Sequence, residues 1–267
     1  MRFCRFELKG TPTYGRIDGD RIVPLDGAPW AGGAARTGEA EVPLAGAVLL
    51  VPSEASKVVC IGQNYRKHAE EMGKQVPAEP LIFIKPSTAL NATGRPIVLP
   101  PASQEVHHEA ELAVVVGRRL TRVSEDEARA GIFGFTCFND VTARDIQRRE
   151  IQHTRGKGYD TFACAGPWME TAMETAMGTG TATGIDPGDL RVVCRVNGQV
   201  RQDGRTSDMV FSAARLLSFI SHVMTLLPGD LVSTGTPSGV GRLVEGDRVE
   251  VEIEGIGTLA NPVIKLA

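Results

Sequence analysis

The sequence predicts a mostly β protein of the α+β class, and three observations support this prediction. Thirty of the 267 residues are glycine, roughly 11% against a usual ~7%, which indicates many turns. Short runs rich in Val, Ile and aromatic residues lie between Gly, Asp and Pro clusters along most of the chain, as is typical of strands. Apolar residues recur clearly at helical spacing in only one stretch, residues 212–223.

Two groups of strands are expected along the chain. Residues 1–50 are expected to form a small N-terminal β domain and linker, with a hairpin turn at 18–20 and an Ala/Gly-rich loop over 27–46. Its strands are expected at 2–8, 13–17 and 21–24. Residues 51–267 would form a larger domain, with strands at 57–62, 81–85, 97–99, 107–117, 134–139, 189–197, 230–234 and 248–253. Helices are expected at 64–73, 125–130 after an N-cap at Ser124, 141–152 and 212–223, and a surface loop is expected at 170–184.

Charge and composition exclude several classes of function. A formal net charge of −3 provides no basic field, so a nucleic-acid partner is not expected. No apolar run reaches the length of a membrane span and no apolar signal segment is seen near the N-terminus, so we expect a cytoplasmic protein without a membrane partner. The five cysteines are scattered without Cys-x-x-Cys spacing, as expected for reduced thiols in that compartment.

The segment 107–117 organises the candidate site. Its β-branched second half predicts a strand, in which alternate side chains share a face. Glu109 and Glu111 would therefore project together, while Ala110 and Leu112 anchor the other face in a core. Two adjacent carboxylates repel each other unless a cation neutralises them, and hard cations such as Mg²⁺ and Ca²⁺ prefer oxygen ligands. The alternative is a solvated strand end without a metal.

A third acid, Asp140, stands where a predicted strand gives way to a predicted helix. Together with Glu109 and Glu111 it would provide three carboxylates and leave coordination positions open for water and substrate. By itself, its position favours the alternative role of capping the following helix.

Other polar residues could act on a bound substrate. His68 and Glu71 are three residues apart on a predicted helical turn, so the carboxylate could orient the imidazole as a general base for water. An exposed polar helix is the alternative for this pair. Lys85 and Lys157 are flanked by turn residues and could meet an anionic substrate, although surface lysines show the same pattern. Residues 227–241 form a predicted strand and glycine-rich loop that could hold an anion, but the P-loop ending is missing.

Six motifs follow one another along the chain. They are GQNYxxH at 62–68, FIKP at 83–86, HHEAEL at 107–112, NDVTARDIQ at 139–147, KGYDTF at 157–162 and TGTP at 234–237. In this order they resemble the fumarylacetoacetate hydrolase (FAH) family over about residues 50–265, and they indicate that residues 51–267 form an FAH-like catalytic domain. The residues before the first motif resemble the family only loosely, as an N-terminal extension.

The resemblance implies an FAH-type mixed β-sandwich roll, a homodimer and a bound Mg²⁺ or Mn²⁺. It assigns metal binding to Glu109, Glu111 and Asp140, catalysis to His68, Glu71 and Lys157, and substrate binding to Lys85, Arg144, Gln147 and Thr236. His68 and Glu71 would lie on a mobile lid and activate water. A Met/Thr/Ala/Gly-rich insertion at 169–186 departs from the family pattern, which leaves the neighbouring loops and the dimer edge open.

These implications predict a Mg²⁺-dependent catabolic hydrolase. It would cleave a C–C bond in a small 2,4-dioxo acid of the acylpyruvate or fumarylpyruvate type. The nearest alternative is an isomerase of the 5-carboxymethyl-2-hydroxymuconate type or an oxaloacetate decarboxylase, which would use the same metal site without an attacking water. A non-enzymatic binding or structural domain is the alternative from another class.

Overall fold

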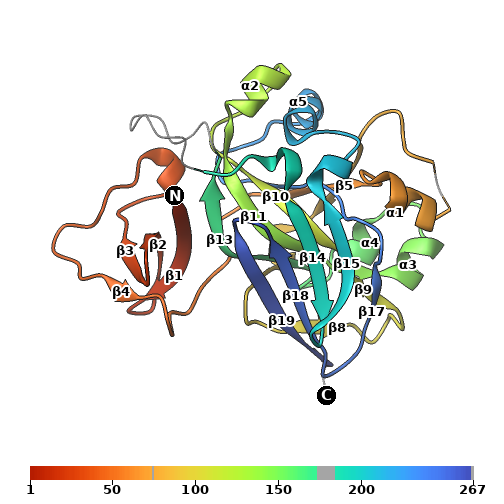
Figure 1. Cartoon of the computed structure of the whole chain (residues 1–267), viewed down its shortest axis with the longest axis horizontal. Coiled ribbons are helices and arrows are strands. Elements are labelled where there is room, and N and C mark those ends of the chain that lie inside the picture. Colours follow the sequence, from red (N-terminus) through yellow and green to blue (C-terminus); the bar gives the residue numbers. More distant parts are fainter. Residues whose placement is uncertain (74, 173–183, 266–267) are drawn as a thin grey trace.

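The computed structural model describes residues 1–73, 75–172 and 184–265. Within these residues, eleven strands form the largest sheet: β1 (Arg2–Leu8), β2 (Thr11–Asp18), β3 (Arg21–Pro24), β4 (Val42–Pro43), β5 (Val58–Gly62), β6 (Leu81–Lys85), β7 (Leu90–Ala92), β10 (Ala110–Val116), β11 (Ile132–Asp140), β13 (Ala163–Thr171) and β16 (Leu231–Ser233). Ten of them lie in the order β4-β3-β2-β1-β13-β11-β10-β16-β5-β6, and β7 pairs in parallel with β13. Neighbouring strands in this sheet therefore often come from distant parts of the sequence, as for β1 beside β13 (Figure 1).

Two smaller sheets and short helices complete the described fold. The five-stranded sheet contains β15 (Gln199–Arg205), β14 (Arg191–Val196), β18 (Arg248–Ile253), β19 (Gly257–Lys265) and β8 (Ile97–Leu99), in that order. The three-stranded sheet contains β12 (Thr142–Ala143), β9 (Val106–His108) and β17 (Gly241–Leu243). The α-helices are α1 (Arg66–Glu71), α2 (Glu125–Arg129), α3 (Arg144–Arg149), α4 (Thr154–Lys157) and α5 (Ala213–Val223). None of the described helices is long and apolar enough to span a membrane.

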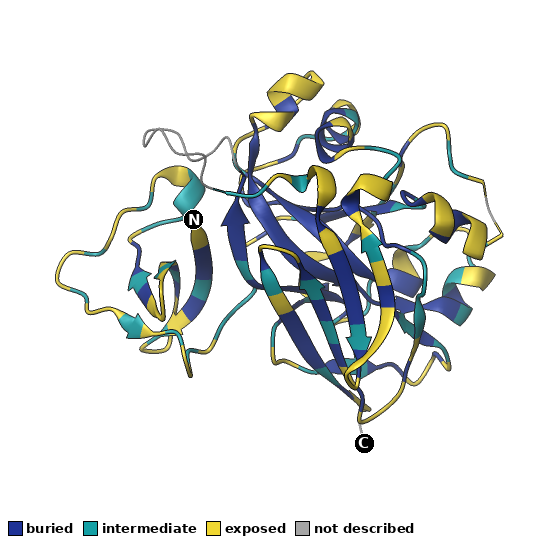
Figure 2. Ribbon diagram, in the orientation of Figure 1, coloured by how far each residue is buried: buried dark blue, intermediate teal, exposed yellow. Residues whose placement is uncertain are grey.

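The main core lies between the largest sheet and the five-stranded sheet, where β10, β11 and β13 contact β14, β18 and β19. Leu112, Val114 and Val116 of β10 belong to this core, whereas Ala113 and Val115 belong to a second core on the opposite face. Strand β10 is therefore buried on both faces, as Figure 2 shows for the centre of the molecule. Each fully buried Val or Leu contributes about 1.5–3 kcal/mol of hydrophobic stabilisation. Strand β10 is therefore held firmly at its N-terminal end, where the candidate site lies.

The N-terminal strands extend the largest sheet rather than forming a separate one. Strand β1 pairs antiparallel with β13, with Arg2 opposite Glu170, so β1 to β4 continue the sheet outward (Figure 1). Trp30, in the expected Ala/Gly-rich loop, contacts the rings of Tyr14 and Phe133 edge-on at centroid distances of 5.4 and 5.7 Å. The domain boundary at residue 50 stays a prediction.

The predicted fold class is confirmed, because the described chain is mostly strand with few helices. Two predicted helix starts are also present: Ser212 caps α5, and Ser124 caps α2 in a reciprocal capping box with Glu127. The five cysteines are all buried and free. Three long strands, β13, β15 and β19, were not predicted. The sequence of β15 (QVRQDGR) is polar and shows no strand pattern, since Gln202 is its one buried residue.

Three local predictions were wrong. The helix expected at 141–152 is confined to α3, because Thr142 and Ala143 pair instead with β9. The strand expected over 107–117 is broken at Glu109, and its two parts, β9 and β10, belong to different sheets. The loop expected from residue 170 begins later, since β13 continues to Thr171; residues 173–183 lie outside the described residues.

Candidate metal centre and active site

Three carboxylates gather at the junction of the largest and the three-stranded sheets. Glu109, Glu111 and Asp140 are all buried, and each offers an oxygen atom within 4.8 Å of the others. Asp140 ends β11, Glu111 lies near the start of β10, and Glu109 precedes β10. The Asp140 N–H donates to the Glu109 carbonyl at 2.9 Å, and the Glu109 N–H donates to the Asn139 side chain at 2.9 Å. The backbone therefore holds the three acids together.

The structure brings these acids together differently from the predicted geometry. Glu109 and Glu111 were expected on one face of a continuous strand, but Glu109 lies in the break between β9 and β10, so strand alternation alone does not account for their proximity. The alternative role of Asp140 as a helix cap is wrong, because the N-cap of α3 is Ala143 and no side chain caps this helix. The Asp140 side chain instead faces two buried lysines.

Basic side chains neutralise two of the three acids. The Lys157 ammonium donates to Glu109 and to Asp140, both at 2.7 Å. Arg144 forms an ion pair with Glu109, and Lys85 forms one with Asp140. Burial by itself would raise the pKa of Glu109, but the charges of Lys157 and Arg144 hold it well below its usual range. Burial would likewise lower the pKa of Lys157, but Asp140 and Glu109 raise it to about 12.

Glu111 differs from the other two acids because its hydrogen-bond donors are uncharged. Its carboxylate accepts from the Ser233 hydroxyl and from the Gly235 N–H, the latter at 2.9 Å. Burial, followed by the charges of Asp140 and Glu109, raises the pKa of Glu111 well above its ordinary value. A hard divalent cation would take the place of that proton, since metal ligands must be deprotonated. The all-oxygen donor set fits Mg²⁺ or Mn²⁺.

The predicted His68–Glu71 pair lies over the same cavity. His68 Nδ1 is 3.1 Å from a Glu71 carboxylate oxygen, and the histidine is only 6% exposed although α1 is short and polar. The Gly239 N–H donates to both oxygens of Glu71, at 3.0 and 3.2 Å. Glu71 is therefore held from the loop that follows β16, and His68 is turned inward.

The cavity between these groups is small, with a volume of about 40 Å³. This is room for a few water-sized groups. Its polar lining residues include Glu109, Glu111, Arg144, Gln147, Lys157, Thr236 and His68, and its apolar lining residues include Ile61, Met72, Leu81 and Phe83. Lys85 is fully buried but not part of this lining; it donates to the Val141 carbonyl at 2.9 Å and supports Asp140.

Two further lining residues, Gln63 and His153, were missed by the sequence analysis. The His153 ring contacts Phe83 edge-on at 5.4 Å, and the Lys157 ammonium lies 4.9 Å from the centre of the same ring. His153 precedes Lys157 by four residues, and its carbonyl accepts from the Lys157 N–H at 3.0 Å. One helical turn of spacing from a candidate catalytic lysine was the signal that could have identified it.

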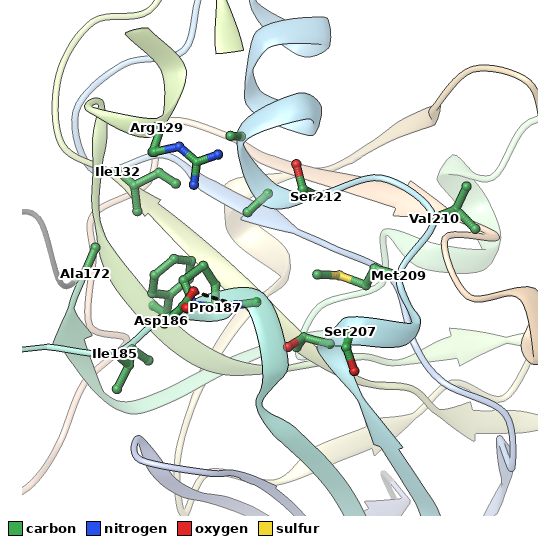
Figure 3. A pocket seen from close by; sticks show the side chains of 15 residues that line it. Arg129, Ile132, Ala172, Ile185, Asp186, Pro187, Ser207, Met209, Val210 and Ser212 are labelled. Carbon is green, nitrogen blue, oxygen red and sulfur yellow. Dashed lines mark hydrogen bonds between the residues drawn. The ribbon is translucent and has the colours of Figure 1, made fainter. Parts of the chain in front are cut away.

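A larger hollow of about 480 Å³ lies elsewhere, between α2, α5 and the end of β13 (Figure 3). Arg129 and Ile132 border it on one side, and Met209 and Ser207 on the other. Asp186 is the only carboxylate in its described lining, and that side chain already accepts from the Gly188 N–H at 2.9 Å. We therefore place the candidate chemistry at the smaller cavity, whose lining includes two of the three acids, the cationic side chains of Arg144 and Lys157, and two histidines.

The fold and this site define a class of protein: a mostly β protein of two facing sheets with a buried three-carboxylate centre suited to a divalent cation. The chain belongs to the fumarylacetoacetate hydrolase family. Residues 57–264 match the family model "Fumarylacetoacetate (FAA) hydrolase C-terminal", and residues 1–52 match the model "Rv2993c-like, N-terminal".

Three relatives show the range of proteins to which this chain is similar. It is 42% identical over 217 residues to the mitochondrial oxaloacetate tautomerase FAHD2A of Homo sapiens, which covers 78% of this chain and 66% of that protein. It is 41% identical to 5-carboxymethyl-2-hydroxymuconate delta-isomerase from Mycobacterium smegmatis, with a TM-score of 0.89 and full coverage of both chains. It is 30% identical to fumarylpyruvate hydrolase from Pseudomonas aeruginosa in complex with Mn²⁺ and pyruvate, with a TM-score of 0.72. The match covers 81% of this chain and 91% of that chain.

Proposed function

We propose that this protein is a divalent-metal-dependent hydrolase that cleaves a C–C bond in a small 2,4-dioxo acid. The observation that carries the proposal is the placement of His68, held by Glu71 at 3.1 Å, over the cavity that contains Glu109 and Glu111. A general base beside a three-carboxylate centre is the arrangement that hydrolysis of an activated carbonyl compound needs.

The anionic end of the substrate would bind to the basic side of the cavity. The Nε of Arg144 is buried and without a hydrogen-bond partner among the described residues, although the other guanidinium nitrogens bond Gln147 and Glu109. A buried donor without a partner costs free energy unless a ligand satisfies it, and a carboxylate is the ligand that a guanidinium prefers. A divalent cation held by the three acids would supply Lewis acidity towards the 2-oxo-carboxylate group.

The remaining residues would move protons and stabilise charge. The His68 imidazole, oriented by Glu71, would take a proton from water as the water attacks the distal carbonyl carbon of the substrate. The bond between that carbon and its neighbour then breaks, and its electron pair passes to the 2-oxo acid part as an enolate. The Lys157 ammonium lies 2.7 Å from both Glu109 and Asp140 and would place positive charge beside this enolate. Protonation of the enolate carbon by the imidazolium would complete the reaction.

Isomerisation or tautomerisation of a 2-oxo acid is the second candidate. It is supported by the names of the tautomerase and isomerase relatives. In this case His68 would transfer a proton between carbon and oxygen, and no water would attack.

A substrate panel separates the two candidates. Purified protein would be assayed with an acylpyruvate, oxaloacetate and a carboxymethyl-hydroxymuconate-type acid, each with and without Mg²⁺ or Mn²⁺. Metal-dependent release of pyruvate from the acylpyruvate supports the hydrolase, whereas keto–enol interconversion without cleavage supports the second candidate. Absence of turnover of every acid by metal-loaded protein would refute both.

A further inference from the structure

Gln202 is a buried side chain on an otherwise exposed strand, and it points at the candidate active site from the five-stranded sheet. It is 1% exposed, whereas its neighbours in β15 are exposed or half-buried. It does not line the cavity, but it contacts residues that lead into it. A buried amide is expected to satisfy its donors and acceptors, so the partners of Gln202 show what it holds in place.

All the partners of Gln202 belong to segments around the cavity. Its Nε2 donates to the Thr236 hydroxyl at 2.7 Å and to the Pro237 carbonyl at 2.8 Å. Its Oε1 accepts from the Ala110 N–H at 3.0 Å and lies 3.0 Å from His108 Nδ1. The orientation of the amide is unambiguous, because a backbone N–H can only donate and a backbone carbonyl can only accept.

These bonds determine the state of the Thr236 hydroxyl. Its oxygen accepts from Gln202 Nε2, and its hydrogen is donated to the Ala110 carbonyl at 2.8 Å. A hydroxyl has one hydrogen and two lone pairs, so only one lone pair remains for a ligand. Thr236 is 3% exposed and lines the cavity, so that lone pair is the only hydrogen-bonding capacity its side chain can offer there.

We propose that Gln202 is a positioning residue that, together with the Ala110 carbonyl, makes the Thr236 hydroxyl an obligate hydrogen-bond acceptor in the active site. Thr236 then recognises a protonated oxygen of the ligand, the O–H of an enol or of a 2-hydroxy acid, and offers no donor to a ketone or carboxylate. This inference rests on the proposed function, since it assumes that a 2-oxo acid or its enol occupies the cavity. It adds to that function a preference for the enol tautomer.

The loop that carries Thr236 also supports other parts of the site. The Gly235 N–H donates to Glu111, and the Gly239 N–H donates to Glu71. A displaced loop would therefore weaken every ligand, whereas a change in the polarity of Thr236 alone would weaken only ligands that carry an O–H. Two ligands of similar size, one with an O–H and the other with a ketone at carbon 2, separate the two effects.

Lactate and pyruvate are such a pair, and their dissociation constants would be measured at saturating Mg²⁺. Thr236→Val removes the hydroxyl but keeps the shape, so it should weaken lactate binding by about 2- to 10-fold, the effect of one neutral hydrogen bond, and leave pyruvate binding nearly unchanged. Gln202→Met removes the N–H that fixes one lone pair of the Thr236 oxygen, so the Ala110 carbonyl alone then holds the hydroxyl hydrogen and the hydroxyl can rotate to donate to a ketone. The ratio of the two dissociation constants should therefore shift in favour of pyruvate, as in Thr236→Val. In the double variant the two shifts should not add, because Gln202 acts through Thr236.

Asn261→Leu provides a matched control. Asn261 is another buried amide, 1% exposed, that donates to the Ala92 and Arg95 carbonyls at 2.8 Å and has no side-chain hydrogen bond to a lining residue of the cavity among the described residues. This variant should lower the melting temperature and leave the ratio of the two dissociation constants unchanged. Thr236→Ser, which keeps the hydroxyl, should retain the wild-type ratio.

Equal weakening of both ligands by Thr236→Val, or additive shifts in the double variant, would overturn the inference. If Gln202→Met does not fold, the comparison of Thr236→Val with Thr236→Ser decides alone. Failure of the proposed function is a separate outcome: wild-type protein would then turn over no 2-oxo acid at all. If the wild-type protein turns over a 2-oxo acid but the ratio of the lactate and pyruvate dissociation constants does not change in Thr236→Val, only the inference is refuted.

Discussion

Replacing His68 with alanine tests the proposed water-activating pair directly. His68 is 6% exposed, its Nδ1 lies 3.1 Å from Glu71, and it lines the cavity without bonding to Glu109, Glu111 or Asp140 among the described contacts. The variant should therefore keep its bound cation. Loss of a positioned general base lowers the rate by about 10²–10⁴-fold, or about 3–5.5 kcal/mol in activation free energy, and acylpyruvate hydrolysis should fall by this amount.

Glu71→Gln should have a smaller effect, and the structure indicates its size. The amide oxygen of the variant can still accept from the Gly239 N–H, so the contact at 3.0 Å is retained. Only the charge that orients and stabilises the His68 imidazolium is lost. Hydrogen bonds to charged groups contribute about 1.5–3 kcal/mol and neutral ones about 0.5–1.5 kcal/mol, so the difference of about 1–1.5 kcal/mol corresponds to roughly a 5- to 13-fold decrease in rate.

Both variants would be assayed for hydrolysis of an acylpyruvate and for decarboxylation of oxaloacetate at saturating Mg²⁺, with metal content measured in parallel. Decarboxylation should change much less, since it needs no attacking water. His222→Ala is the matched control, because this exposed histidine of α5 bonds only the Ser218 carbonyl of its own helix among the described residues. A His68→Ala protein that hydrolyses as fast as wild type with its metal bound would refute the proposed role of the pair.

Further predictions concern the charges of the site. Glu111→Gln should lower the number of protons released per bound Mg²⁺, because burial raises the pKa of Glu111 and a cation must displace any proton that this carboxyl holds; calorimetry in buffers of different ionisation enthalpy measures the number. Lys157→Met should destabilise the metal-free protein by about 3–5 kcal/mol, since two buried carboxylates lose their shared partner; denaturant unfolding measures this loss. Burial lowers the pKa of His108 from 6.5 to about 4, so its contribution to stability is present above pH 6.5 and is lost as pH falls through 4. The loss amounts to about 3 kcal/mol, and His108→Gln should remove this part of the acid sensitivity in pH-dependent unfolding. Residues 65–77, the predicted lid, should exchange amide hydrogens more slowly once oxalate is bound; equal exchange with and without oxalate would contradict gating.

Local sequence determined the features of the fold that depend on neighbouring residues. The alternation of faces along β10, the Ser124 cap of α2 and the amphipathic pattern of α5 were predicted from a few adjacent positions. The same holds for the pairing of His68 with Glu71, because three residues are less than one helical turn. The order of the six motifs was likewise sufficient to indicate the family, which the matching family model shows.

Tertiary structure alone decided how the candidate site is assembled. Lys85 was predicted to contact the substrate; it is fully buried and forms an ion pair with Asp140, 55 residues away in sequence, a contact that the sequence did not indicate. Gln202 was overlooked because β15 has no hydrophobic pattern, and its role depends on Thr236, 34 residues further along. The physical reason is that hydrogen bonds between strands of different sheets join residues that have no fixed spacing in the chain. Periodicity in the sequence identifies the face of a strand on which a side chain lies, but only the packing of the sheets determines which other side chain it contacts.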